Sequence, residues 1–467
     1  MLTGAEYLTS MKDGRQLYVD GALVEDPVNH PLLASAYKFV ASTYDKMWDP
    51  NKAVGPYYTI PQDVGELRTL MEGVSDWDDL ASVTASGLMA LVTTAARMPA
   101  DDPAYAPYIE RIKEFHRYCV ENDLRCVQAI TDAKGDRQLP PSRQADPDSY
   151  TRIVERRPDG IVINGAKLHI TGAAMAHEMI VMPTKRMKAD ESDWAVACAV
   201  PVNAEGVKIV NTTFAPRGEQ QDYWPVSSVH NLAEGFIIFD NVFVPNERVF
   251  LAGEVEHSAT FAHALGLWER VSGGMHMADA ADTLVGFAQL IAEANGVAKI
   301  AHIKDKIAEM VITATLIRGG LEAAIANAET TPEGWVHPNE LYTNAVKHYG
   351  GAQWTLMCRH LHDIAGGAVL TAPTPDDLAN SEVGPLLHKY MVGRDGVDAD
   401  YRSRLFHAIR DYTADALGGW WYVTLLQSGG GLFAQRMVSV KHYPMAGAKR
   451  LALRTAHFSD ETVAGVQ

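Results

Sequence analysis

A threonine and a glycine end an apolar segment in the middle of the chain, where they could contact a ligand. Thr171 and Gly172 follow Leu168 and Ile170, so they stand at the end of an expected strand. A threonine hydroxyl donates hydrogen bonds, and a residue without a side chain lets a flat ligand come close to backbone N–H groups. Two interpretations stay open, a ligand-contacting strand end and an ordinary strand end.

A polar loop follows another short apolar segment, residues 127–130. The loop is Thr131-Asp132-Ala133-Lys134-Gly135-Asp136-Arg137. A polar loop with a glycine could wrap a phosphate group or the edge of a flavin. A solvated hairpin tip fits the same residues.

An acidic residue stands directly before a third apolar segment. Glu234 follows Asn231-Leu232-Ala233 and precedes the run FIIF. This position favours a partly buried carboxylate with a raised pKa, and an exposed loop acid is the alternative. His177 comes just before a core strand, and we interpret it as a hydrogen-bonded structural histidine.

A sheet must hold these residues, and residues 127–250 have the pattern of one. Apolar runs rich in β-branched residues are separated by Asn-Gly or Gly-Ala-Ala; they cover 161–163, 168–170 and 179–182. We interpret residues 159–184 as a β-meander of consecutive antiparallel strands. Further strands are expected over 195–200, 207–210 and 236–239.

Helices are predicted on both sides of this sheet. Residues 5–125 have mostly helical patterns, with a helix at 83–92 that is buried or faces a pocket, and residues 259–454 are helical again. Gly366-Gly367 and Gly429-Gly430-Gly431 are candidates for close approach to a ligand or a neighbouring subunit. The predicted fold class is α+β, with an N-terminal helical domain (1–126), a middle antiparallel β-domain (127–255) and a C-terminal helical bundle (256–467).

Composition excludes several functions. The net charge of -17, from 41 Lys and Arg against 58 Asp and Glu, argues against nucleic acid or an anionic membrane as partner. No apolar run has the length of a membrane span and no signal core is present, so a cytoplasmic protein is expected. The spread cysteines are expected as reduced thiols, and metal binding by Cys119 and Cys126 is not expected because Asn122-Asp123 breaks their helix.

Several long phrases resemble a known family. AITDAKGDR, NGAKLHITGAA, FDNVFVPNERVF and HDIAGGAV occur in the order found in the acyl-CoA dehydrogenase superfamily. ENDLRCVQAITDAKGDRQLPPSRQADPDSY and RRPDGIVINGAKLHITGAAMAHEMIVMPT are similar to its branch with 4-hydroxyphenylacetate 3-monooxygenase and 4-hydroxybutyryl-CoA dehydratase, and are closer to the dehydratase side. The resemblance covers nearly the whole chain and implies an acyl-CoA dehydrogenase-like fold and bound FAD.

The resemblance also implies site residues. Flavin-contacting positions of the family fall on Thr131, Lys134, Asp136, Arg137 and Thr171. Glu234 matches a glutamate of the dehydratase site that serves as a base or a charge near the substrate. Gly366 and Gly367 match a glycine turn that lies near the cofactor of a neighbouring subunit.

Two departures restrict the function. The dehydratase holds an iron–sulfur cluster with three cysteines and a histidine, and this chain has Gly87, Leu91, Trp268 and Met275 at those places. These residues supply no usable ligand set, so no cluster and no metal are expected, and Trp268 and Met275 are interpreted as core packing.

The phenol-hydroxylating relatives use an Arg, a Tyr and a His. Here those places fall on Val92, Ala96 and Gln128, with Arg97 adjacent to Ala96. Gln128 can hydrogen-bond a substrate but cannot act as a base near neutrality. The candidate catalytic residues are therefore Glu234, Gln128 and Arg97.

The leading hypothesis is an FAD-dependent monooxygenase that takes reduced flavin from a separate reductase and hydroxylates a small aromatic substrate. No G-x-G-x-x-G fingerprint follows a strand, which favours reduction by a partner protein over bound NADH. The alternatives are a cluster-free acyl-CoA dehydratase or isomerase, and a flavin-binding homologue without catalysis. A homo-oligomer, either a dimer or a tetramer, is expected.

Overall fold

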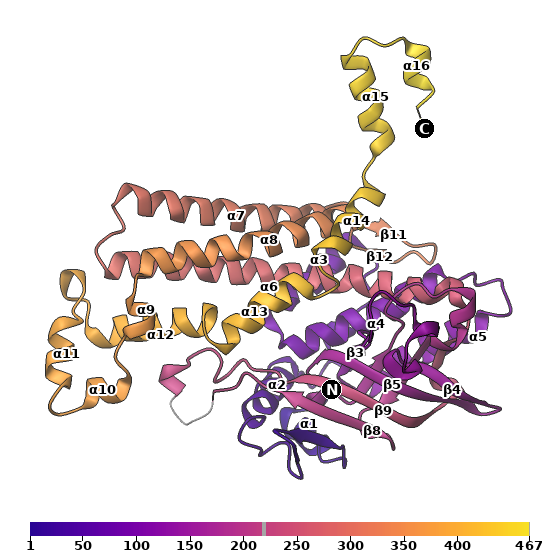
Figure 1. Ribbon diagram of the computed structural model, residues 1–467, viewed down its shortest axis with the longest axis horizontal. Coiled ribbons are helices and arrows are strands. Elements are labelled where there is room, and N and C mark those ends of the chain that lie inside the picture. The colour runs from indigo at the N-terminus through magenta and orange to yellow at the C-terminus, as the bar shows by residue number, and fades with distance from the viewer. Residues whose placement is uncertain (217–220, 467) are drawn as a thin grey trace.

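Helices flank a sheet-rich middle part in the computed structural model, which describes residues 1–216 and 221–466 (Figure 1). The N-terminal helices are α1 Gly4–Ser10, α2 Ala34–Met47, α3 Val64–Gly73, α4 Asp79–Arg97 and α5 Ala106–Asn122. The longest helices follow the sheets: α6 Ser258–Ala294, α7 Ala301–Ala326 and α8 Glu340–Ala365. Shorter helices complete the chain: α9 Ala368–Thr371, α10 Pro375–Ala379, α11 Gly384–Tyr390, α12 Ala399–Thr413, α13 Ala416–Gln427, α14 Leu432–His442, α15 Met445–Thr455 and α16 Asp460–Ala464. This order confirms the predicted α+β fold class.

Two sheets form the middle part. The six-stranded sheet has the order β2 Ala22–Leu23, β1 Leu17–Val19, β8 Val207–Thr212, β9 Glu234–Pro245, β5 Gly160–Thr171, β4 Arg152–Arg157. The four-stranded sheet has the order β10 Val249–Ala252, β7 Val196–Pro201, β6 Glu178–Val181, β3 Cys126–Ala129. A small hairpin, β11 Glu329–Thr330 and β12 Val336–His337, lies between α7 and α8.

The four-stranded sheet is buried on both faces. Alternate residues of a strand point to opposite faces, so Ile180 of β6 joins the helical core, and Met179 and Val181 join the core with the six-stranded sheet. This explains why residues 179–182 are all apolar. The layers are therefore helices, four-stranded sheet and six-stranded sheet.

The predicted meander was wrong in two respects. Residues 160–171 form the single strand β5, because Asn164-Gly165 makes a β-bulge and not a turn. Gly165 has a φ of 130°, and a Cβ at this position would lie 2.6 Å from the Cα of Thr151. Residues 178–181 form β6 in the other sheet, where β6 pairs in parallel with β3. The turn dipeptide was therefore a misleading signal, since the same residues serve a bulge.

The N-terminal part also contributes strands that its helical pattern did not predict. β1 pairs in parallel with β8, with Leu17 opposite Ile209 and Val19 opposite Asn211. Leu17 and Val19 are buried in the core of the sheets. Strand β1 thus connects the N-terminal segment to the sheet, and its partner strand β8 is more than 180 residues away in the sequence.

Helix α4 lies at the centre of the molecule. Its N-cap Asp78 accepts a hydrogen bond from the Ala81 N–H (2.9 Å), and Thr84 Oγ1 accepts one from the Cys126 N–H of β3 (2.9 Å). α4 also has the length and apolarity of a membrane span, which corrects the expectation that no such run exists, and 78% of that window is buried inside the protein. The prediction that residues 83–92 form a buried or pocket-facing helix is confirmed.

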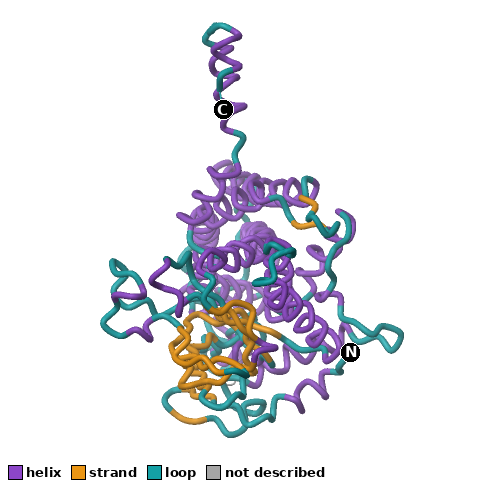
Figure 2. The backbone as a smooth tube through the Cα atoms, turned by 90° about the vertical axis from the view of Figure 1, so that its right-hand side faces the viewer, coloured by secondary structure: helices purple, strands orange, loops and turns teal. Residues whose placement is uncertain are grey.

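The chain ends in an arm that projects from the body. Figures 1 and 2 show α15 and α16 standing apart from the other helices. α15 has no buried residue, and large apolar side chains are exposed along α14 and α15, among them Phe433, Val440 and Leu451.

Candidate active site

A cavity of about 1570 Å³ lies where the sheets meet the helices. Its walls come from α4, from β3 and the loop after it, from the end of β5 and the start of β9, and from α6, α13 and α14. Seven of the predicted site residues line it: Arg97, Gln128, Thr131, Lys134, Arg137, Thr171 and Glu234. The fold therefore brings together residues from both the β-domain and the helical parts.

Thr171 and Glu234 form a hydrogen-bonded pair in the cavity wall. They lie opposite each other on β5 and β9, and the Thr171 hydroxyl donates to Glu234 Oε1 at 2.9 Å. The indole N–H of Trp420, from α13, donates to the same carboxylate at 2.7 Å. Burial raises the pKa of Glu234, and the hydrogen bonds from Trp420 and Thr171 lower it in part. The sequence left open whether this acid is buried, and the structure places it in a partly buried wall.

The backbone at Gly172 does not offer its N–H to the cavity. This N–H donates to the Ala233 carbonyl at 2.9 Å, because the strand pairing continues past Thr171. The prediction of free backbone donors at this strand end was therefore wrong. The Thr171 hydroxyl oxygen keeps its acceptor capacity toward the cavity.

A buried ion pair anchors the loop 131–137. Lys167 of β5 and Asp132 lie 2.7 Å apart, both are almost fully buried, and Lys167 Nζ also donates to the carbonyls of Ile130 and Met182. Beyond Asp132 the chain turns through Lys134 and Gly135, which both have positive φ. Burial lowers the pKa of the Lys134 ammonium, and the neighbouring Arg137 lowers it further. The loop thus presents cationic side chains at the cavity, and it is not only a solvated tip.

His169 was missed by the sequence analysis. It lines the cavity from a second irregularity of β5, between Lys167 and Ile170, and its φ of 60° is unusual for a residue with a side chain. Partial burial lowers the pKa of His169, and the charges of Lys134 and Arg137 lower it too. No local pattern marks this position, since the bulge depends on the pairing with β9.

Gln128 and Arg97 occupy the side of the cavity next to α4. The Gln128 amide donates to the Val83 carbonyl, and a Cβ at Gly87 would lie 3.0 Å from Gln128 Cγ. Arg97 is paired with Glu340, the first residue of α8, at 3.1 Å. Gly87 therefore leaves the space in which the Gln128 side chain packs.

Glu269 and Lys347 are two charged residues of this region that the sequence analysis also missed. Glu269 of α6 lines the cavity, and burial raises its pKa to about 7, although the charge of Lys347 opposes this shift. Burial lowers the pKa of Lys347 on α8 to about 8. A signal existed, because Glu269 and Arg270 interrupt a strongly apolar helical stretch.

Three predicted cofactor residues do not line the cavity. Asp136 is exposed, and its carboxylate accepts a hydrogen bond from the Gln138 N–H within its own turn (2.9 Å). Gly366 and Gly367 follow the C-terminal end of α8, roughly 37 Å along the helix from Glu340 at the cavity. Their predicted contact with a cofactor requires a second subunit and stays a prediction.

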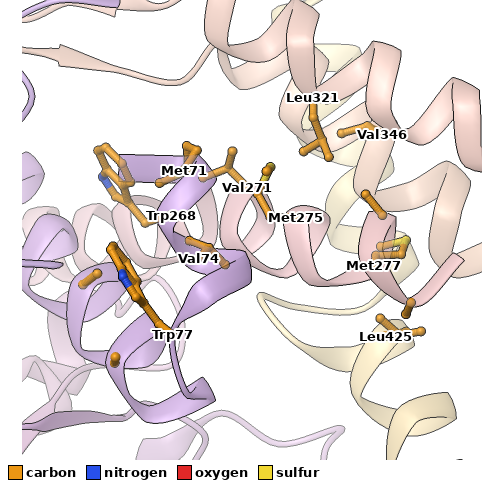
Figure 3. Close-up of a cluster of buried hydrophobic side chains, with 14 of the residues drawn as sticks. Met71, Val74, Trp77, Trp268, Val271, Met275, Met277, Leu321, Val346 and Leu425 are labelled. Atoms are coloured by element: carbon orange, nitrogen blue, oxygen red, sulfur yellow. The ribbon is translucent and has the colours of Figure 1, made fainter. Parts of the chain in front are cut away.

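The places of the cluster ligands are filled by core packing. Trp268 is 1% exposed, donates to Thr93 Oγ1 at 2.8 Å, and lies with Met275 in a band of buried apolar side chains (Figure 3). In the part of the chain that the structure describes, no three His, Cys, Asp or Glu side chains come together as a metal site. The interpretation of Trp268 and Met275 as core residues is confirmed.

His177 has a structural position. Its Nδ1 accepts a hydrogen bond from the Arg125 N–H and its Nε2 lies 2.9 Å from Ser10 Oγ. Burial lowers the pKa of His177 to about 3, with smaller effects from Arg15 and Arg125. The neutral imidazole connects the Arg125 backbone to the Ser10 side chain by hydrogen bonds, as predicted for a structural histidine.

Solved structures share this fold. The archaeal 4-hydroxybutyryl-CoA dehydratase from N. maritimus has a TM-score of 0.89 and 29% identity, over 100% of this chain and 96% of the other. The oxygenase component of 4-hydroxyphenylacetate 3-monooxygenase complexed with FAD has a TM-score of 0.86, 24% identity and 98% and 99% coverage. Glutaryl-coenzyme A dehydrogenase has a TM-score of 0.50 at 14% identity, over 94% of this chain and 93% of the other. The fold is the acyl-CoA dehydrogenase-like one that the sequence predicted.

The family follows from the sequence comparison. The family models described as 4-hydroxyphenylacetate 3-hydroxylase N terminal and C terminal match residues 3–251 and 258–457. The chain therefore belongs to the 4-hydroxyphenylacetate 3-hydroxylase family. A 4-hydroxybutyryl-CoA dehydratase/vinylacetyl-CoA-Delta-isomerase of Clostridium aminobutyricum is 31% identical, over 89% of this chain and 88% of the relative. The 4-hydroxyphenylacetate 3-monooxygenase oxygenase component of Thermus thermophilus is 27% identical, over 89% of each.

Proposed function

We propose that the protein is the FAD-dependent oxygenase component of a two-component monooxygenase, which hydroxylates a small aromatic substrate. The observation that supports it most is the cavity. Ligand pockets usually measure about 300–1,000 Å³, so a cavity of about 1570 Å³ leaves room for a flavin and a substrate together. Reduced FAD would come from a separate reductase, as in the two-component relatives.

The residues present fit FAD. Thr171 and Glu234 stand at a wall where a ring edge can hydrogen-bond, and Trp420 and Val423 of helix α13 add apolar surface to the lining of the cavity. Cationic side chains that match an anionic pyrophosphate line the cavity beside the loop: Lys134, Arg137, Lys185 and Arg186. When bound, FAD supplies the electron-transfer and oxygen chemistry that the side chains cannot.

The side chains of this chain have three tasks in that site. Trp420 and Thr171 hold Glu234 by hydrogen bonds, so the carboxylate stays in one position whether or not it carries a proton. The helices α6, α13 and α14 form part of the cavity wall, and they would separate a bound ring from water on that side. The amide of Gln128 orients a polar group of the substrate without taking a proton from it.

Isotope labelling tests the function. The protein is loaded with FAD, supplied with NADH and a flavin reductase, and offered a panel of phenols under isotopically labelled O2. We expect one labelled oxygen atom in the product and no stoichiometric iron in the purified protein. A protein that does not bind FAD, or that converts its substrate without O2, contradicts the proposal.

A cluster-free acyl-CoA dehydratase or isomerase is the second candidate. The observation in its favour is that the cavity holds two carboxyl groups with raised pKa values, Glu234 and Glu269, which could move protons. Deuterium exchange from solvent into vinylacetyl-CoA, abolished by Glu234→Gln, would select this candidate. If FAD binds and neither reaction occurs, the chain is a flavin-binding homologue without catalysis.

We also propose that copies of the chain assemble. The exposed apolar side chains of α14 and α15 would be covered by a neighbour, and Gly366-Gly367 would then come close to the cofactor of that neighbour. Light scattering of the purified protein would show a dimer or a tetramer, and a monomer would overturn this assignment. A cytoplasmic location stays a prediction.

A further inference from the structure

The inner end of the cavity contains a carboxylate that has no part in the proposed monooxygenase function. Glu269 reaches this end from α6, while Gln128 and Ser86 reach it from β3 and α4. The polar side chains of Ser86 and Gln128 lower the pKa of Glu269 against the larger effect of burial. The Gln128 amide is itself fixed by its hydrogen bond to the Val83 carbonyl. Glu269 thus lines the cavity together with a fixed amide group.

Lys347 is the cation whose charge acts on Glu269, and its own position is fixed. It is fully buried on α8, its Nζ donates to the Leu425 carbonyl at 2.6 Å, and a Cβ on Gly273 would come within 3.3 Å of its Cε. The ammonium group has few positions to choose from, since these neighbours surround it. The charge of this ammonium group favours the negative form of Glu269 and so lowers its pKa.

The two arginines in this region have partners of their own. On α6, Arg270 donates to the Gly429 carbonyl and to Asn344 Oδ1, each at 2.8 Å. Arg97 of α4 pairs with Glu340 of α8. His263, one helical turn and a half before Glu269, is exposed at the cavity with a lowered pKa. Among the charged groups of this region, Lys347 is the one whose charge lowers the pKa of Glu269.

We propose that Glu269, backed by Lys347, is the base of this site, and that the site takes an uncharged aromatic molecule with a hydroxyl group pointing at Glu269. The substrate O–H bond breaks and a carboxyl O–H bond forms, so the charge moves from Glu269 to the substrate oxygen and no oxidant is needed in this step. The proposal rests on the proposed function and names the substrate class. Glu269 then accepts the proton of the substrate hydroxyl, which Gln128 cannot do near neutrality.

The pKa values of Glu269 and Lys347 agree with the role of Glu269 as a base. A base works best when its pKa is near the working pH, and the pKa of Glu269 is about 7. Lys347, with a pKa of about 8, is still charged when Glu269 loses its proton. Glu234 at the other wall is the competing carboxyl group and provides a matched control.

Binding of p-cresol to the oxidised, FAD-loaded protein tests the proposal without turnover. The p-cresol hydroxyl ionises near pH 10, like tyrosine, so the probe stays neutral at pH 6 and pH 8. If only ionised Glu269 accepts its hydroxyl, affinity rises about tenfold from pH 6 to pH 8, because the competent fraction rises from about one eleventh to ten elevenths. Glu269→Gln should remove this rise, Glu269→Asp should keep it in part, and Glu234→Gln should keep it.

A second variant shows whether a lost rise in affinity in Glu269→Gln comes from the missing carboxylate or from a folding defect. Lys347→Met removes the charge that lowers the pKa of Glu269, so the rise in affinity should move to higher pH while FAD still binds. The proposal is overturned if p-cresol does not bind, if Glu269→Gln keeps the rise, or if Glu234→Gln alone removes it. A pH-dependent binding step without any labelled product would contradict the proposed function and leave this assignment of Glu269 intact.

Discussion

The indole N–H of Trp420 donates a 2.7 Å hydrogen bond to Glu234, across 186 residues of sequence. It joins helix α13 to the first residue of β9 and so connects the C-terminal helices to the sheet at the cavity. Trp420 also packs on Phe214, with ring centroids 5.2 Å apart. The state of the Glu234 carboxyl group therefore depends on how the helical part docks.

Trp420→Phe should raise the pKa of Glu234. The hydrogen bond from Trp420 lowers this pKa, and phenylalanine keeps the ring but has no donor. Infrared titration of the carboxyl band, assigned with Glu234→Gln, would measure the change. Trp421→Phe is the control, since the Trp421 ring packs on Tyr412 and on Trp420 but the hydrogen bond to Glu234 comes from Trp420 alone; an equal shift in both variants would contradict the assignment.

Lys167→Met should destabilise the protein by about 3–5 kcal/mol, because it leaves the buried Asp132 without its cation. Denaturant unfolding would measure the loss, together with FAD affinity, which should fall as the loop 131–137 loosens. The surface pair Lys208–Asp240, at 2.9 Å, provides the comparison. Lys208→Met should cost less than about 1 kcal/mol, and equal costs for the two variants would show that burial does not matter here.

Gly87→Ala should displace the Gln128 side chain. The added methyl group would lie 3.0 Å from Gln128 Cγ and 3.1 Å from its amide nitrogen, so Gln128 should lower the pKa of Glu269 less than it does now. We expect a net loss of about 1 kcal/mol, within the usual range for single substitutions, and a raised pKa of Glu269. Gly319→Ala, in the exposed interior of α7 with open space around it, should instead stabilise by about 0.5–1 kcal/mol.

Glu269→Gln should stabilise the protein more at pH 7.5 than at pH 5. The pKa of Glu269 is raised in the folded state, so its contribution to stability is complete below its unfolded value and is lost as the pH rises through about 7. At pH 5 the acid is still neutral in the folded protein, although it already ionises in the unfolded chain, so the two proteins should differ much less than at pH 7.5. Thermal unfolding at the two pH values would measure this difference; a larger effect at pH 5 would reverse the sign and refute the assignment.

The sequence by itself determined the fold class, the family and several of the residues that line the cavity. Three signals are local and can be recognised in the sequence alone: helical periodicity, the shift to strands after residue 126 and the long family phrases. The same phrases placed Thr171, Lys134, Arg137 and Glu234 at the site. They also showed that no cluster ligands stand at positions 87, 91, 268 and 275.

Only the tertiary structure decided which residues share the cavity and in what state. Asn164-Gly165 has the composition of a turn, but pairing with β9 makes it a bulge, and the same pairing directs His169 to the cavity and takes the Gly172 N–H away from it. Glu269 and Lys347 lie 78 residues apart on separate helices, and no local pattern shows that the charge of Lys347 acts on Glu269. Burial, which sets their pKa values, is a property of the packed chain and not of any segment.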